Sequence, residues 1–66
     1  MEENRIKVLT ALAYILVANE LGYNDKPLTE EDITLLLMQH YVTMDEMWFL
    51  DELVRDVIQE VKKNER

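Results

Sequence analysis

The only glycine and the only proline of this chain, Gly22 and Pro27, lie in one short stretch. Glycine favours the left-handed conformation that ends many helices, and proline cannot continue a helix. Residues 23–28, which read YNDKPL, are therefore predicted to form a turn between two helical segments. The rest of the chain has neither breaker and no sustained alternation of apolar and polar residues, so the sequence predicts helices and no strands.

Two threonines mark where the later helices begin. Thr29 stands three residues before Asp32, and Thr43 stands three residues before Glu46. A threonine followed at this spacing by an acid is a capping box, which closes the first turn of a helix. The prediction is one all-α domain with a long, a short and a long helix: about residues 2–21, 30–41 and 44–64.

A chain of 66 residues is near the lower size limit for folding alone, so an additional constraint is usual. The chain has no cysteine, which excludes disulfides and thiolate metal sites, and a single histidine, His40, argues against a zinc site. Oligomerisation is the constraint that remains. The absence of cysteine also agrees with a reducing, cytoplasmic location.

Helical spacing places apolar side chains on more than one side of the predicted helices. In the second helix Ile33, Leu36 and Leu37 form one face, and Leu35 and Met38 lie outside it. A helix that is apolar on all sides must be buried on two of them. We therefore expect a homodimeric helical bundle, with the first helices packed against their symmetry mates. The expected interface residues are Val8, Leu12, Ile15, Leu16, Leu35 and Met38.

Negative charge is concentrated in residues 27–61, which hold nine carboxylates and one base, Arg55; the net charge of the chain is −7. Such a body repels phosphates and anionic membranes and attracts basic partners, so direct nucleic-acid binding is not expected. The longest mostly apolar run, residues 8–18, is shorter than the roughly 20 residues needed to cross a bilayer. Acids as well as bases precede this run, which favours a buried helix over a signal peptide.

Motifs for catalysis and for cofactors are missing from the sequence. The chain has no serine or cysteine nucleophile, and a single glycine excludes glycine-rich phosphate loops. The acids of residues 25–32 lack the order of a calcium-binding loop. We therefore expect no enzymatic activity, no metal and no cofactor.

The candidate binding surface lies at the start of the third helix, where Trp48 and Phe49 fall beside a stripe of acids. Exposed aromatic residues among charges are typical of contact hot spots. In the alternative interpretation both aromatics pack inside the domain or the dimer, and the acids form an ordinary solvated face. The expected partner-binding residues are Met44, Asp45, Trp48, Phe49, Asp51, Glu52 and Asp56.

Two functions fit these features. The first is a binding or inhibitory module that docks the acidic, aromatic-tipped third helix on a basic surface of a partner protein. Where that surface normally holds nucleic acid, the module would mimic phosphates. The second is a structural or assembly module whose apolar surface serves homo-oligomerisation, with acids that only keep it soluble. In size, charge and lack of catalytic residues the chain resembles small acidic helical inhibitors and accessory proteins of phages and bacteria, a resemblance of class that covers no motif.

Overall fold

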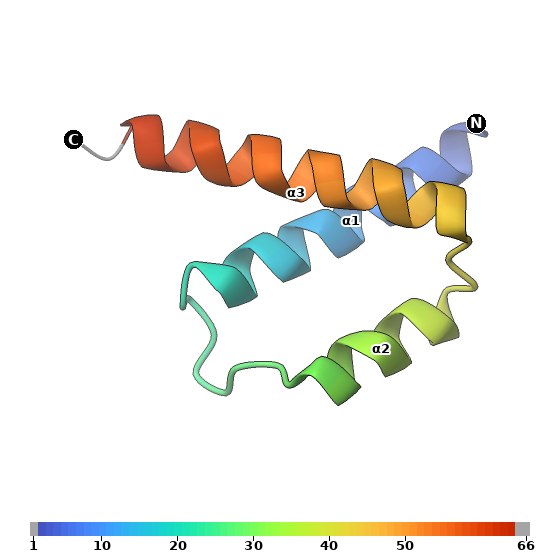
Figure 1. The fold of residues 1–66 in the computed structure, drawn as a ribbon, viewed down its shortest axis with the longest axis horizontal. Helices are drawn as coiled ribbons and strands as arrows, with labels where there is room; N and C mark the ends of the chain where they lie inside the picture. The colour runs from blue at the N-terminus through green and yellow to red at the C-terminus, as the bar shows by residue number, and fades with distance from the viewer. Residues whose placement is uncertain (1, 65–66) are drawn as a thin grey trace.

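The computed structural model describes residues 2–64, which form three α-helices (Figure 1). They are α1 (Glu3–Glu20), α2 (Glu30–Gln39) and α3 (Met44–Asn64). The predicted all-α fold of a long, a short and a long helix is confirmed. α1 and α3 run in the same direction and α2 returns in the opposite one (Figure 1). None of the helices in residues 2–64 combines the length and the apolar character that a membrane crossing requires.

Both predicted capping boxes form. The amide of Asp32 donates to the Thr29 hydroxyl at 3.1 Å, and the amide of Thr29 donates to the Asp32 carboxylate at 3.1 Å. At α3 the amide of Glu46 donates to the Thr43 hydroxyl at 3.2 Å, and Glu46 accepts from the amide of Thr43 at 2.9 Å. These bonds satisfy backbone donors that a helix start leaves without an intrahelical partner.

α1 ends as the position of Gly22 predicts. Gly22 adopts φ +80°, and the amide of Tyr23 donates to the carbonyl of Ala18 at 2.9 Å. This bond across five residues, closed by a left-handed glycine, is the Schellman motif. α1 and α2 end one and two residues earlier than predicted, because residues 21–22 and 40–41 belong to the caps.

α2 ends in the same motif without a glycine. The amide of Val42 donates to the carbonyl of Leu37 at 3.2 Å, and Tyr41 takes the left-handed position with φ 54°. For an L-residue with a side chain, this conformation is unfavourable by about 1 kcal/mol. The turn between α2 and α3 is therefore held in a strained conformation at a residue that is 86% exposed.

The core lies between α1 and α3. Its buried residues are Leu9, Leu12 and Ala13 of α1 and Leu50 of α3. α2 contributes Leu36 and Leu37, which are only partly buried against this cluster, and none of its ten residues is fully buried. No Cα atom of α2 comes within 8 Å of a Cα atom of α1 or α3, all three helices lying inside the described range. α2 therefore rests on the side of a two-helix core.

Candidate partner-binding surface

Polar contacts hold α2 at its two ends. Before its start, the side-chain oxygen of Asn19 accepts a hydrogen bond from the amide of Leu28 at 2.7 Å, which ties the preceding loop to α1. Beyond its end, Nη1 of Arg5 donates to the carbonyl of His40 at 3.1 Å. Arg5 also donates from Nε and Nη2 to the two carboxylate oxygens of Glu46 at 2.8 and 2.7 Å. Arg5 thus joins the start of α1, the end of α2 and the start of α3.

This contact changes the role of Glu46. Hydrogen bonds from Arg5 and then from the amide of Thr43 lower the pKa of Glu46 to about 2, from an ordinary value of 4.5. Glu46 is therefore ionised at neutral pH, and its charge is balanced by Arg5. It fixes the first turn of α3 and adds no unpaired charge to the surface of that helix.

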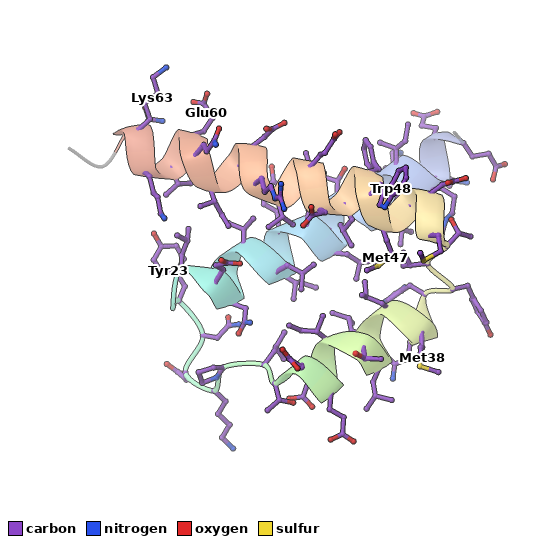
Figure 2. The ribbon with its side chains drawn as sticks, viewed as in Figure 1. Tyr23, Met38, Met47, Trp48, Glu60 and Lys63 are labelled. Carbon is purple, nitrogen blue, oxygen red and sulfur yellow. The ribbon has the colours of Figure 1, made fainter. Side chains whose placement is uncertain are left out.

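Trp48 and Met44 project outward from that fixed first turn. Trp48 is 74% exposed and Met44 is 77% exposed, although both belong to a regular helix. At about 100° per residue they lie on one side of α3, nearly opposite the buried Leu50. Figure 2 shows Trp48 on the first half of α3, at the end of the molecule where a turn links α2 to α3. The two side chains therefore form an apolar patch outside the core.

The charges around this patch are mainly negative. Asp45 precedes Trp48 by three residues and Glu52 follows it by four, so both neighbour the indole on the helix surface. Asp51 pairs with Arg55, whose Nη2 lies 3.3 Å from its carboxylate. Asp51 thus neutralises Arg55, the only base of residues 27–61. Asp45 and Glu52 remain, so the charge around the patch is negative.

Phe49 does not share this surface. It is partly buried against the core cluster between α1 and α3, because one further residue turns its side chain by about 100° toward α1. The aromatic pair of the prediction is thus divided into a packed Phe49 and an exposed Trp48. Asp56, two turns beyond Trp48, is exposed on the side of α3 that continues from Phe49. The outward patch consists of Met44 and Trp48, with Asp45, Asp51 and Glu52 around them.

The predicted oligomer-interface residues also divide into two sets. Leu12 is 2% exposed and belongs to the core of the protomer, and Val8 and Leu16 pack against that core. These three side chains serve the fold. The others remain accessible, with exposed fractions of 41%, 50% and 65%: Ile15, Leu35 and Met38.

Sequence reasoning missed the residues that position this surface. Arg5 and Glu46 lie 41 positions apart, and no local pattern links them. Asn19 is one of several asparagines, and its contact with Leu28 depends on the path of the loop. Tyr41 could have been noticed as an aromatic residue at the predicted end of the second helix.

Within residues 2–64 no group of three or more acidic or histidine side chains is arranged to hold a metal ion. No family model matches this chain, and neither does any curated protein or solved structure.

Proposed function

We propose that this protein is a binding module that docks the start of α3 on a basic surface of a partner protein. The observation that carries the proposal is the exposure of Trp48 and Met44, 74% and 77%, on the outward side of α3. Tryptophan is the residue most typical of binding hot spots, because it buries a large apolar area while its N–H can still donate a hydrogen bond. An adjacent methionine adapts its shape to the partner.

The rim of the patch defines the chemistry of the partner. Asp45 and Glu52 flank the indole, and within residues 2–64 neither forms an ion pair. Carboxylates around an apolar centre attract a cationic surface and speed its association. Surfaces that bind nucleic acid belong to this class, and on such a surface the carboxylates would take the place of phosphates.

The patch is also preorganised. The capping box of Thr43 and Glu46 and the double hydrogen bond from Arg5 fix the first turn of α3 before any partner arrives. Docking then orders few additional groups, so more of the contact energy appears as affinity.

The test is capture from a cell extract with the immobilised wild-type protein and two matched variants. Trp48→Ala is expected to lose the captured protein, and Glu52→Lys is expected to lose it as well. Tyr14→Ala removes an aromatic residue of similar exposure, 64%, on α1 and is expected to retain the captured protein. Rising salt should release that protein, because exposed charge pairs are screened.

Direct binding of the purified captured protein completes the test. Trp48 is the only tryptophan, so a shift of its emission to shorter wavelength would report burial of this side chain. Retention that is unchanged in Trp48→Ala and indifferent to salt would refute the proposal. Competition by a DNA oligonucleotide would identify a surface that normally holds nucleic acid.

A further inference from the structure

The protein exposes more surface than a compact monomer of its mass. Its accessible surface is 5487 Å². Folded monomers of 7.9 kDa are expected to expose about 4,400 Å². The radius of gyration agrees, at 12.2 Å against about 10.8 Å for a compact domain of 66 residues. The excess of about 1,100 Å² is close to the area that one partner contributes to a stable interface, about 800 Å².

Exposed and partly exposed apolar residues gather on two surfaces that do not overlap. One is the patch of Met44 and Trp48 on α3. The other, here called the α2 face, combines α1, the loop and α2, and consists of Ile15, Leu28, Leu35, Leu36 and Met38. Four of these residues, all except Met38, line a shallow hollow of about 340 Å³ together with Asp32 and Gln39. Met38 continues the face, because it lies three residues after Leu35 on the same helix.

The charges of the α2 face differ from those around Trp48. Asp32 is the only acid that lines the hollow, and its carboxylate already accepts a hydrogen bond from the amide of Thr29. The hollow therefore offers little attraction to a cationic partner. It also presents little repulsion to a negatively charged surface. These properties fit a second copy of the chain better than a basic protein.

We propose that a second copy of this chain covers the α2 face, giving a twofold dimer in which α2 packs against its symmetry mate. A twofold axis that crosses α2 between Leu35 and Met38 makes the two helices antiparallel. The Glu31 side chains of the two copies then lie roughly 16 Å apart along the helix axis. This separation exceeds the Debye length of about 8 Å at physiological salt, so their repulsion is largely screened.

The dimer explains why α2 carries apolar side chains on two sides. Leu36 and Leu37 rest on the core of their own protomer, and Leu35 and Met38 reach the second copy. The mate supplies the close neighbour that α2 lacks in its own chain. The α3 patch stays free, so this inference goes beyond the proposed function and does not depend on it.

The mass of the wild-type protein in a dilution series, measured by sedimentation equilibrium, tests the dimer. The expected mass at the concentrated end is about twice 7.9 kDa. A wild-type protein that stays at the monomer mass throughout the series would overturn the proposal. This result does not depend on whether any variant folds.

Two substitutions of matched exposure test the face. Ile15 and Ile6 are both 41% exposed, and their separation of nine positions places them on opposite sides of α1. Ile15→Glu places a charge in the apolar hollow of the α2 face and is expected to weaken dimerisation about a hundredfold. Ile6→Glu adds the same charge outside the face and is expected to leave the mass unchanged. Equal weakening by both variants would overturn the assignment of the face.

The two proposals can fail separately. Trp48→Ala is expected to remain a dimer while losing the captured partner, and Ile15→Glu is expected to become a monomer while keeping Trp48 available. Salt should act in opposite directions, because screening strengthens contact between two chains of charge −7 and weakens contact with a basic surface. Dissociation of the dimer by added salt would contradict the apolar α2 face.

Discussion

α1 and α3 hold each other by packing, whereas α2 is held mainly by polar contacts at its ends. Leu9, Leu12 and Leu50 are at most 3% exposed in the first region. None of the residues of α2 is fully buried, and its two ends are fixed by a hydrogen bond that Asn19 accepts from Leu28 and one that Arg5 donates to His40. The contrast teaches that two different sources of order, apolar packing and terminal hydrogen bonds, hold the two regions of this molecule. Segments with few buried contacts open at lower free energy than the core, so α2 is the region most easily rearranged by a partner or a second copy.

The largest effect is expected when a leucine side chain is shortened to alanine in each of the two regions. Leu12→Ala removes a buried side chain between α1 and α3 and should lower the free energy of unfolding by about 3 kcal/mol. Leu37→Ala, in the partly buried face of α2, should lower it by about 1 kcal/mol. Urea denaturation followed by circular dichroism, at equal protein concentration, measures both values.

A core of this size supplies only about 3–5 kcal/mol, so Leu12→Ala is expected to keep at most about 2 kcal/mol and to unfold at low urea concentration. Leu37→Ala should keep its helical signal. If both variants lost the same free energy of unfolding, α2 would pack as tightly as α1 and α3, and the contrast between the two regions would be wrong.

The next largest effect is expected at the ion pair of Arg5 and Glu46, because Arg5 also bonds to the end of α2 and so joins the two regions. The folded pKa of Glu46, about 2, is below its unfolded value near 4.5 because Arg5 and Thr43 donate to its ionised form. The unfolded chain therefore binds more protons in this window, and stability falls as the pH is lowered from about 5 to about 2. Above that window the contribution of Glu46 is fully present.

Glu46→Gln isolates this contribution. The variant keeps an acceptor for Arg5 but loses the charge, so it should melt at a lower temperature than the wild type at pH 7. The gap between the two melting temperatures should close as the pH falls toward 2. Glu60→Gln, an exposed acid far along α3, serves as the control and should follow the wild-type profile. A gap that stays constant with pH would mean that the ion pair does not form in solution.

Sequence reasoning succeeded where the deciding contacts are local. Gly22 and the two capping boxes act within five residues, so the helix ends could be predicted closely. It failed where side chains meet across the chain, as Arg5 and Glu46 do. It also left open whether Trp48 and Phe49 pack inside the domain or form an exposed pair. A difference of one residue, or about 100°, separates the packed Phe49 from the exposed Trp48.

The smallest effects are expected at the two helix ends that share the Schellman motif. Gly22 ends α1 and Tyr41 ends α2, with φ values of +80° and 54°. Tyr41→Gly removes the unfavourable contacts of a side chain in the left-handed region but makes the unfolded chain more flexible, so the net gain should be below about 1 kcal/mol. Gly22→Ala should lose about 1 kcal/mol.

At Gly22 an added Cβ would meet no atom within 4 Å, so any loss there reports the backbone conformation alone. Thermal denaturation measures the change in stability of each variant relative to the wild type. A gain for Tyr41→Gly together with a loss for Gly22→Ala would show that the end of α1 is optimised for stability and the end of α2 is not. If Tyr41→Gly instead destabilised the protein, the exposed tyrosine ring would have to contribute contacts in solution, and the turn between α2 and α3 would belong to the packed region. Whether Tyr41→Gly stabilises or destabilises the protein therefore decides whether the turn belongs with α2 or with the packed region of α1 and α3.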